Sequence, residues 1–580
     1  MKKIYLSAAL LACTLLNAQS AFTWDLTSYK GAFPVTDNTP ATDWTNTWTE
    51  WDPEAKVYGA PTTTISGNIA TTTTLSGVVY LDGFVHVINN AELYILPGTV
   101  IRGKLTDVTV TPGVLVISRG SKIHAVGTAA NPIVFTSIKS ETGGRAGGDW
   151  GGLAICGNAK TNTHTLPTPV GSFKEAKLEG FVTNEPNGYR NYGGNNDADN
   201  SGELSYVRIE FAGVSLNPTV LNNEINGLTL GAVGSGTKID HIQVSFCGDD
   251  SFEWFGGTVD AKYLISNRTR DDDFDTDNGF SGRIQFGLAI RDPYIADDAD
   301  PSYASNGFEC DNNGTSPYYA LPITKAVFSN ITMVGPYGDG TAYGDIPGVN
   351  ARHAAGAHLR RNMAQSVFNS LFVGWKQGLR YQGGNTKDNL TATAIDSSAA
   401  YANNIITDVT SQTTYVNDGT TFDKPWYHAY ASANNVDTLT TAAQIAFVNA
   451  WIQLGSGTPD YRLQAASTAS AGASFTNSNI GGGFTGVNQI SKLVVNSFVV
   501  YPNPANTSTS ISFDIAENNK VTILVYNVLG NLVSNLSQSN DFEKGNNTIQ
   551  LNTSNLASGV YYITLDINGA KETKKLIISK

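Results

Sequence analysis

The sequence is poor in cysteine, in methionine and in cationic residues. It has 4 Cys and 3 Met among 580 residues, and 37 Lys and Arg stand against 50 Asp and Glu, for a formal net charge of −13. A surface of this sign repels phosphate backbones, so nucleic acid is not expected as a partner. Acidic chains are instead well suited to recruiting divalent cations.

The few cysteines exclude a disulfide-rich scaffold. Three of them, Cys156, Cys247 and Cys310, follow the N-terminal apolar segment. An odd number leaves at least one unpaired in an exported protein, and their spacing fits no zinc motif. We expect buried thiols that pack as small apolar side chains. A Cys247–Cys310 disulfide is the alternative, which spacing does not decide.

Long apolar runs are absent after the first residues. Residues 1–18 join the basic "MKK" to an apolar stretch and the small Ala18, a pattern typical of a secretory signal peptide cleaved near Ala18. A lipoprotein signal ending at Cys13 is the alternative, although the apolar run continues to Leu16. No later stretch has the roughly 18 uninterrupted apolar residues of a transmembrane helix, so no membrane span is expected in the mature protein.

Short β-branched runs separated by Gly, Asn and Asp fill residues 76–390. Examples are "GVVYLDGFVHV", "GVLVISRGSKIHAVG" and "KIDHIQVSF". Runs that recur about every 20–25 residues are typical of a solenoid, whose coils bury each other's apolar face. The sequence therefore predicts an all-β chain with a right-handed parallel β-helix over 76–390. An N-terminal segment and cap (19–75) precede it, and last coils, a cap and a linker (391–495) follow.

An acidic phrase recurs within this region. "DDSFEWFGG" starts at Asp249, "DDDFDTDNG" follows 22 residues later, and "GFECDNN" is a third copy. Equivalent residues of stacked coils lie about 4.8 Å apart, and side chains alternate between the two faces of a strand. Phe252, Phe274 and Phe308 are therefore predicted to form one inward aromatic stack.

The acidic residues of the phrase are predicted to point outward in two ladders. The later steps are 34 and 49 residues long and require inserted loops, which on one side of a scaffold commonly form a binding wall. One ladder comprises Glu253, Asp275, Glu309, His358 and Arg380, and the other comprises Phe255, Asp277, Asp311, Arg360 and Gln382.

Stacked carboxylates repel, at about 3 kcal/mol per pair for an effective dielectric constant near 20. A positive charge or a shift in carboxyl pKa must offset this repulsion, and three interpretations of the acidic repeat are open. The first is a Ca²⁺ site, because hard cations bind several carboxylate oxygens. Its candidate ligands are Asp271, Asp272, Asp273, Asp275 and Asp277.

The second interpretation is polysaccharide chemistry. Hydrolysis uses two carboxyl groups, and elimination at a uronate needs charge neutralisation and a base. The candidate catalytic residues of a glycoside hydrolase or polysaccharide lyase are Asp275, Glu309, His358 and Arg360. Candidate ligand-binding residues are Glu253, Phe255, Asp277, Asp311 and Arg380.

The third interpretation is structural: arginines neutralise the acids, and the protein is a non-catalytic adhesin or surface component. Candidate arginines are Arg268, Arg270, Arg360, Arg361 and Arg380. The fold alone does not imply an enzymatic activity. We favour Ca²⁺-dependent binding of an extracellular polysaccharide and keep the other two interpretations as alternatives.

Two segments outside the repeats have their own patterns. Trp44, Trp48 and Trp51 are interpreted as a cap over the first coil, with a carbohydrate-stacking platform as the alternative. Residues 441–454, "TAAQIAFVNAWIQL", predict a helix, and the glycine-rich residues 481–489 predict a linker.

The C-terminal residues carry a different pattern. "YPNPA" (501–505), "VYNVLGNLV" (525–533), "LASGVYYITL" (556–565) and "KKLIIS" (574–579) stand in this order. This segment resembles the type A C-terminal sorting domain of type IX secretion cargo in Bacteroidota. The resemblance implies a small β-sandwich over 496–580, recognition by the type IX translocon and sortase, and export to the cell surface or medium. The implied signal residues are Tyr501, Pro502, Asn503, Pro504, Lys574 and Lys575.

The body of the chain resembles a group of exported Bacteroidota β-helix proteins. The resemblance lies in "GDWGGLAICGNA", "EINGLTLGAVGSGT" and "QFGLAIRDP", besides the acidic phrases. That group has no assigned activity to carry over, so the resemblance supports the fold and leaves function open.

Overall fold

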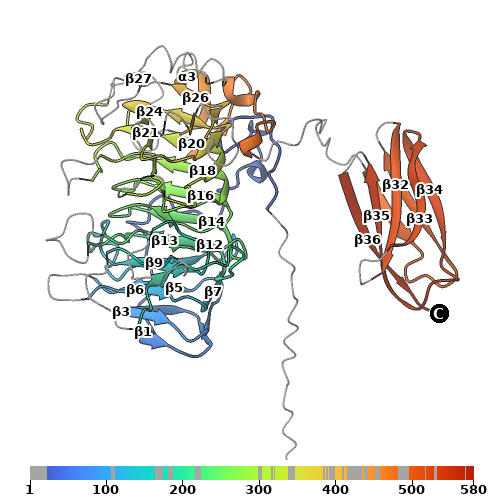
Figure 1. Cartoon of the computed structure of the whole chain (residues 1–580), viewed down its shortest axis with the longest axis horizontal. Helices are drawn as coiled ribbons and strands as arrows, with labels where there is room; N and C mark the ends of the chain where they lie inside the picture. The colour runs from blue at the N-terminus through green and yellow to red at the C-terminus, as the bar shows by residue number, and fades with distance from the viewer. Residues whose placement is uncertain are drawn as a thin grey trace, which may run out of the picture. The chain divides into compact units, whose positions relative to one another are not determined.

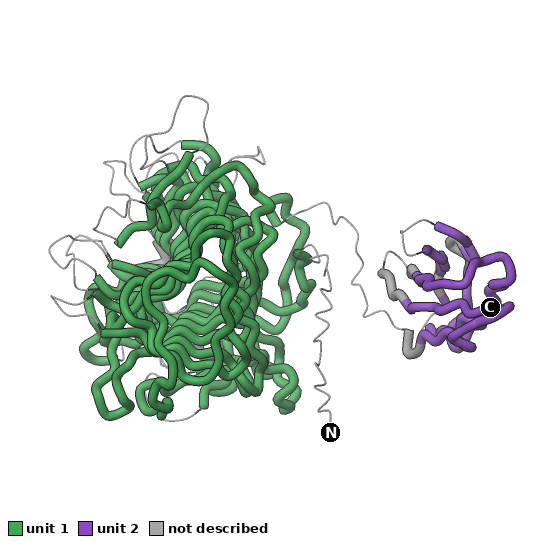
Figure 2. Tube along the Cα trace, turned by 90° about the horizontal axis from the view of Figure 1, so that it is seen from below, with its two compact units in different colours: residues 1–483 green, residues 484–580 purple. Residues whose placement is uncertain are grey.

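A computed structural model of the chain forms two compact units, residues 1–483 and residues 484–580 (Figure 2). It describes residues 22–105, 111–163, 174–180, 187–215, 224–297, 304–314, 318, 320–337, 346–382, 386, 389–390, 399–407, 411–413, 434, 436, 442–450, 458–480, 495–515, 518–527, 532–567 and 570–580. The expected signal peptide (1–18) and linker (481–489) lie outside these residues.

The first unit is a parallel β-helix, as predicted, whose coils stack from β1 to β27 (Figure 1). Parallel pairing between successive coils builds three faces. Face A contains β6 Val114–Ile117, β9 Gly152–Cys156, β13 Leu228–Gly231, β15 Phe252–Phe255, β17 Phe274–Asp277, β19 Phe308–Cys310, β21 Ala355–Leu359, β24 Gln377–Tyr381 and β27 Ser411–Thr413.

The other two faces share the longer strands, which bend from one face onto the next. Face B contains β2 Thr73–Leu75, β4 Glu92–Ile95, β7 Lys122–Val126, β22 Ser366–Phe368 and β25 Tyr401–Ala402, and face C contains β5 Val100–Gly103, β8 Ile133–Ser137, β23 Leu371–Val373 and β26 Ile405–Thr407. Strands β12 Gly202–Glu210, β14 Lys238–Ser245, β16 Ala261–Asn267, β18 Arg283–Ile290 and β20 Val327–Val334 run from B to C, whereas β1 Thr63–Ile69 and β3 Val78–Val87 run from C to A.

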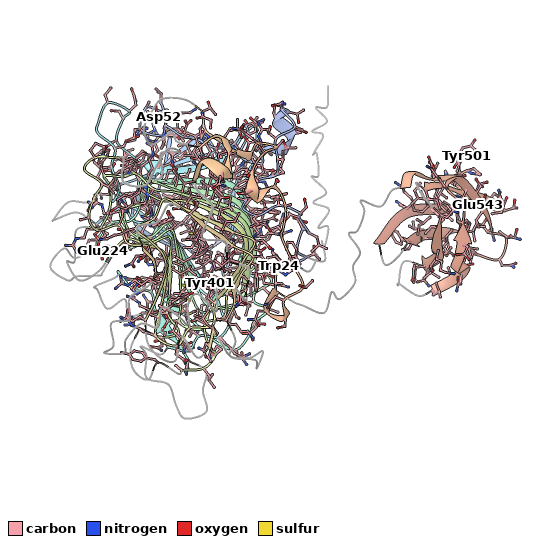
Figure 3. All side chains as sticks on the ribbon, turned by 90° about the horizontal axis from the view of Figure 1, so that it is seen from above. Trp24, Asp52, Glu224, Tyr401, Tyr501 and Glu543 are labelled. Atoms are coloured by element: carbon pink, nitrogen blue, oxygen red, sulfur yellow. The ribbon has the colours of Figure 1, made fainter. Side chains whose placement is uncertain are left out.

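The core runs through the middle of the coils, because every strand turns alternate side chains inward. Tyr401 lies inside the stack seen from above (Figure 3). The predicted aromatic stack is confirmed: ring centroids lie 5.6 Å apart between Phe252 and Phe274, and 5.5 Å apart between Phe274 and Phe308. This stack places the acidic residues that follow each Phe on the outer side of face A.

The three cysteines that the structure describes, Cys156, Cys247 and Cys310, are buried and unpaired, so the predicted buried thiols are confirmed. Cys247 and Cys310 pack in the solenoid core, and Cys156 packs in a smaller apolar cluster outside face A. The alternative disulfide between Cys247 and Cys310 is not formed.

The outer side of face C is covered by residues 22–60, here called the N-terminal strap. Phe33 and Trp48 of the strap pack in one cluster with outward residues of face C, among them Ile265 and Leu288. The Trp48 ring meets Tyr206 at 5.9 Å, and its Nε1 donates to the Trp44 carbonyl oxygen at 2.7 Å. The predicted cap over the first coil is therefore corrected: these tryptophans lie along the flank of coils β12 to β16, and Trp48, only 1% exposed, offers no stacking platform.

The last residues of the first unit pack beside the N-terminal strap on the outer side of face C. Val35 forms a parallel bridge with Leu463. The short elements in this region are η1 Pro40–Thr42, α3 Ala442–Ile445, β28 Phe447–Asn449, β29 Asp460–Leu463, η3 Thr468–Ser470 and η4 Ser478–Ile480. Of the helix predicted over 441–454, residues 442–450 are described, and only Ala442–Ile445 is helical there, because β28 pairs with β29. Residues 441 and 451–454 lie outside the described residues.

The second unit is a β-sandwich, as predicted from the sequence. One sheet has the order β30 Val495–Tyr501, β31 Ser508–Ile515, β34 Gly545–Asn552, and the other has the order β33 Leu532–Phe542, β32 Asn519–Asn527, β35 Gly559–Ile567, β36 Ala570–Ile578. Both sheets are antiparallel and enclose one apolar cluster.

Candidate functional site

The acidic phrase forms an outward ladder on face A, and its predicted register is confirmed along its whole length. The two long insertions leave the register intact, because the strands on either side of each insertion remain paired. The paired residues are Glu253 with Asp275, Asp275 with Glu309, Glu309 with His358, and His358 with Arg380.

The second predicted ladder begins with Phe255 opposite Asp277. Phe255 points outward as expected, but it is only 5% exposed because Tyr192 stacks on it with ring centroids 6.0 Å apart. Tyr192 belongs to a hairpin of β10 Ala176–Lys177 and β11 Asn191–Tyr192 inserted between β9 and β12. Phe255 therefore packs within the protein rather than presenting its ring to a ligand, which sequence reasoning could not foresee.

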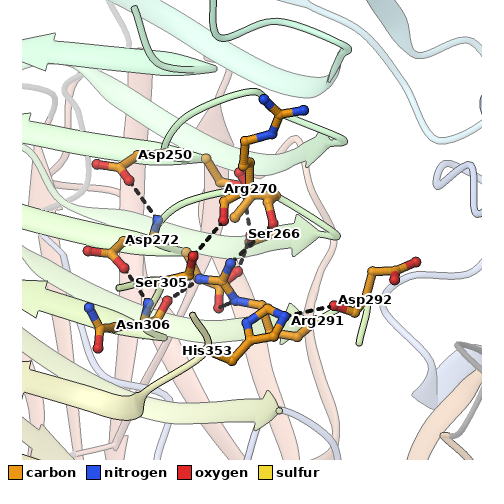
Figure 4. Close-up of polar contacts among 12 residues, drawn as sticks. Asp250, Ser266, Arg270, Asp272, Arg291, Asp292, Ser305, Asn306 and His353 are labelled. Atoms are coloured by element: carbon orange, nitrogen blue, oxygen red, sulfur yellow. Dashed lines mark hydrogen bonds and ion pairs between the residues drawn. The ribbon is translucent and has the colours of Figure 1, made fainter. Parts of the chain in front are cut away.

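Two acids of the phrase accept hydrogen bonds from the backbone of the next coil. Oδ1 of Asp250 accepts the backbone N–H of Asp272 at 2.7 Å, and Oδ1 of Asp272 accepts that of Asn306 (Figure 4). The backbone N–H of Ala355 donates in turn to Oδ1 of Asn306 at 3.3 Å. This column holds the turns before successive face A strands together and accounts for part of the acidic repeat without a ligand.

The Asp273 carboxylate forms a buried ion pair with Arg291. Its Oδ2 accepts from Nε of Arg291 at 3.0 Å, and its Oδ1 accepts from the Ser266 hydroxyl. Arg291 also donates to the carbonyl oxygens of Thr269 and Asn306. Burial raises the pKa of Asp273 to about 6 against the opposing effect of Arg291, and both side chains are fully buried. Asp273, one of the predicted metal ligands, therefore forms a structural ion pair with Arg291 instead.

Two groups of carboxylates bring their oxygens close enough to share a cation. Within each group, one oxygen from every residue lies within 4.8 Å of the others. The first group is Asp249, Asp250 and Asp271, and the second is Asp250, Glu253 and Asp275. Of the predicted metal ligands, Asp271 and Asp275 belong to these groups, whereas Asp272, Asp273 and Asp277 do not. The omitted Asp249 and Asp250 had a sequence signal, since they align with Asp271 and Asp272 in the repeat.

The protein compensates these carboxylates poorly. Oδ1 of Asp271 and Oδ1 of Asp275 are buried and accept no hydrogen bond from any described residue. Burial, and then neighbouring carboxylates, raise the pKa of Asp271, Asp275 and Glu253 well above the usual range. Asn226 is 1% exposed, its Nδ2 contacts Glu253, and its Oδ1 has no described donor. Carboxylate and amide oxygens of this kind fit a hard cation such as Ca²⁺.

The far end of the ladder is basic. Nε of Arg360 and Nη1 of Arg361 each donate to Oδ2 of Asp311 at 2.9 Å, and Arg360 also contacts Glu309. Oδ1 of Asp311 is buried without a described donor. The arginines thus neutralise the acids at this end, as the structural interpretation expects, while the end at Asp250 has no comparable partner among the described residues.

His358 sits between the acidic and the basic residues. Its Nε2 lies 3.2 Å from Oε1 of Gln382 and its Nδ1 lies 3.4 Å from Oε2 of Glu309. Burial and the charge of Arg380 lower the pKa of His358 to about 3, so the ring is neutral at physiological pH and a weak base. The structure brings the four predicted catalytic residues, Asp275, Glu309, His358 and Arg360, to one part of face A.

A groove of about 850 Å³ lies elsewhere, on the outer side of face B. Charges of its lining pair with one another: Lys238 lies 2.5 Å from Glu203, and Arg283 lies 2.6 Å from Asp260. Sequence reasoning missed this groove because its lining comes from short runs on several coils, among them 235–241 and 260–263, that share no repeated motif. The groove differs from face A in having its charges compensated.

A family model described as a pectate-lyase-like β-helix domain matches residues 67–452, more than half of the chain. The chain belongs to this family. The match spans face A and every carboxylate of the two candidate groups.

No curated protein matches this β-helix protein. Among solved structures, full-length tailspike protein 2 (TSP2, ORF211) from Escherichia coli O157:H7 bacteriophage CAB120 is similar at 10% identity with a TM-score of 0.22. The alignment covers 86% of this chain and 64% of the tailspike chain. A likeness this distant does not bear on function.

The C-terminal unit of the β-helix protein matches a secretion system C-terminal sorting domain over residues 499–579. Asn503 joins the two ends of the predicted signal: its Nδ2 donates to the Lys575 carbonyl oxygen at 2.7 Å, and its Oδ1 accepts the backbone N–H of Ile577 at 2.8 Å. Tyr501 beside it is 74% exposed. The domain directs export by the type IX secretion system to the cell surface or the extracellular space.

None of the helices in the described part of the chain has the length and apolar character needed to cross a membrane.

Proposed function

We propose that the exported β-helix binds Ca²⁺ between the carboxylates of face A and uses the ion to hold an extracellular polysaccharide. The observation that carries this proposal is the pair of buried oxygens, Oδ1 of Asp271 and Oδ1 of Asp275, which have no described donor inside a cluster of like charge. Ca²⁺ takes six to eight oxygen ligands at about 2.3–2.6 Å. A bound ion would offset a repulsion of about 3 kcal/mol per carboxylate pair.

Two observations favour a polysaccharide as the ligand. The family is named after pectate lyase, an enzyme that acts on a polysaccharide. In addition, the ladder from Glu253 to Arg380 crosses four coil steps, which span about 19 Å along the solenoid axis. A chain ligand lying along the axis would meet the partly exposed Asp271, Asp275 and Arg380, whereas Glu253, His358 and Arg360 are at most 8% exposed and would act from beneath them.

The test is calorimetric titration of the purified exported protein with pectate, in Ca²⁺ and in chelator. We expect binding in Ca²⁺ that chelation abolishes. The double substitution Asp271→Asn with Asp275→Asn should weaken Ca²⁺ binding at least about tenfold, because ligand charge tunes Ca²⁺ affinity. Glu203→Gln is the matched control, since Glu203 pairs with Lys238 on face B. Pectate binding that is unchanged by chelator would overturn the proposal.

Cleavage of the bound polysaccharide is the second candidate function. Asp275 and Glu309 are neighbours on adjacent coils, and the raised pKa of Asp275 suits a proton donor. An enzyme would release new sugar ends from pectate, and Asp275→Asn or Glu309→Gln would stop this release while binding persists. No product from wild-type protein that still binds pectate would instead support a non-catalytic adhesin.

A further inference from the structure

The sorting domain, residues 484–580, carries a large share of the exposed apolar side chains. Of the fifteen large apolar side chains that are exposed in the described part of the chain, six belong to this smaller unit. They are Val499, Tyr501, Leu532, Val533, Tyr562 and Ile577. Exposed apolar residues that stand singly need no explanation, whereas a contiguous group of them marks an interaction surface.

The outer face of the four-stranded sheet brings such residues together. Tyr526 of β32 pairs with Leu532 of β33 on one side and with Tyr562 of β35 on the other. Tyr562 pairs in turn with Lys575 of β36, and Ile577 lies two residues further along that strand. Paired residues, and residues two apart on one strand, point to the same face of a sheet. Leu532 and Tyr562 are 53% and 41% exposed, so this face is the outer one. These five residues are called the outer row.

The outer face of the other sheet is polar across β31 and β34. The Ser512 hydroxyl lies 2.9 Å from the Thr548 hydroxyl, and Nε2 of Gln550 donates to the Ser510 hydroxyl at 2.7 Å. Val499 is exposed on the edge strand β30 of this sheet. Polar residues thus serve well on an outer sheet face of this domain, so the fold does not require the apolar residues of the outer row.

Packing in the core does not account for the outer row either. The inward residues of the same strands fill the core of the sandwich. None of the four apolar members of the row lies in this core cluster or packs against it. The row is assembled from three of the segments that carry the sorting-domain resemblance, 525–533, 556–565 and 574–579. Segments distant in the sequence therefore meet on a surface that the interior of the domain does not explain.

Lys575 gives one end of the outer row a positive charge. Its side chain is exposed and forms no ion pair with a described residue. Asn503 bonds to the backbone of Lys575 and of Ile577, which fixes this end of the row beside the segment 501–505. A partner that covers the row would meet aromatic and aliphatic groups and then an ammonium group. It should therefore present an apolar surface with a carboxylate at the matching end.

We propose that the outer row is the surface through which a protein of the type IX secretion machinery recognises this domain. The role of the domain is export by that machinery, which requires a protein partner. The row has no acidic member to pair with Lys575, so a second copy of the chain matches it less well than a partner with a carboxylate. The inference goes beyond the proposed function, because it concerns export and holds with or without a cation on face A.

Photo-crosslinking in cells that export the full chain tests the identity of the partner. Benzoylphenylalanine takes the place of Tyr562 in the row, or of the exposed Val499 on the other sheet as the control. We expect position 562, and not position 499, to crosslink to a type IX component that mass spectrometry identifies. A crosslink from position 562 to a second copy of this chain, equal crosslinking from both positions, or no crosslink at all would overturn the proposal.

Export of substituted chains tests how much the row contributes. Tyr562→Ser combined with Leu532→Ser should lower the exported fraction at least about tenfold, because truncation of aromatic anchors weakens interfaces most. Val499→Ser removes apolar surface from the other sheet and should be exported like the wild type. All three side chains are exposed, so the melting temperatures of the purified chains should agree. Wild-type export of the double variant, or an equal loss in the control, would contradict the proposal, and the crosslinking result stands whether or not the double variant folds.

Discussion

His353 shows how one buried side chain makes the stability of this fold depend on pH. The ring is fully buried, and its Nε2 lies 3.1 Å from the Asp292 carbonyl oxygen, so that nitrogen carries the proton (Figure 4). Burial, and then the charge of Arg291, lower the pKa of His353 to about 3. The unfolded chain takes up a proton here near pH 6.5 and the folded chain does not, so stability is lost as the pH falls below about 6.5.

Replacement of this histidine should therefore weaken the pH dependence. His353→Gln keeps an N–H donor for the Asp292 carbonyl oxygen and cannot titrate. Between pH 6.5 and 5, the wild type should lose about 2 kcal/mol more unfolding free energy than the variant, as urea unfolding would show. The face A carboxylates titrate in both proteins and cancel in this difference. Equal losses in the two proteins would refute the assignment.

At the scale of single residues, the sequence could predict which residues form the ladder. It could not predict which of the acidic and aromatic side chains remain free to bind a ligand. The repeat fixes the register of Glu253 and Asp275, because stacked coils place equivalent residues one above another. The repeat cannot show that Arg291 forms an ion pair with Asp273 or that the Tyr192 ring stacks on Phe255. Those contacts come from turns and insertions whose packing follows no period.

At the scale of elements, the N-terminal strap is a structural part of the solenoid. Trp48 is buried against face C, so Trp48→Ala should cost about 3–5 kcal/mol of unfolding free energy and make residues 22–60 sensitive to protease. Leu26→Ala in the same strap is the control, since Leu26 is 45% exposed. Equal stability and protease resistance of both variants would show that the strap contributes little.

The same region shows why element type was predictable for the coils and not here. The coil strands repeat, so every copy supports the same assignment. Residues 441–454 occur once and carry a helical apolar pattern, yet Phe447 and Ala450 are buried beside the strap in a strand-paired segment. Tertiary packing outweighs local propensity at such single-copy positions.

At the scale of the whole molecule, the export signal and the candidate cation site lie in separate units. The sorting domain carries a signal that its sequence motifs revealed, and the β-helix carries carboxylates that only its register brings together. A net charge of −13 disfavours direct contact with an acidic polysaccharide, so a cation would serve both to relieve the cluster and to attract the ligand.

The most direct measurement is the calcium content of the purified exported protein, taken together with its melting temperature in Ca²⁺ and in chelator. We expect at least one Ca²⁺ per chain. We also expect stabilisation of about 2.7 kcal/mol at a free Ca²⁺ concentration one hundred times the dissociation constant, seen as a raised melting temperature. Metal-free protein that melts at the same temperature in both solutions would show that face A holds its carboxylates without a cation.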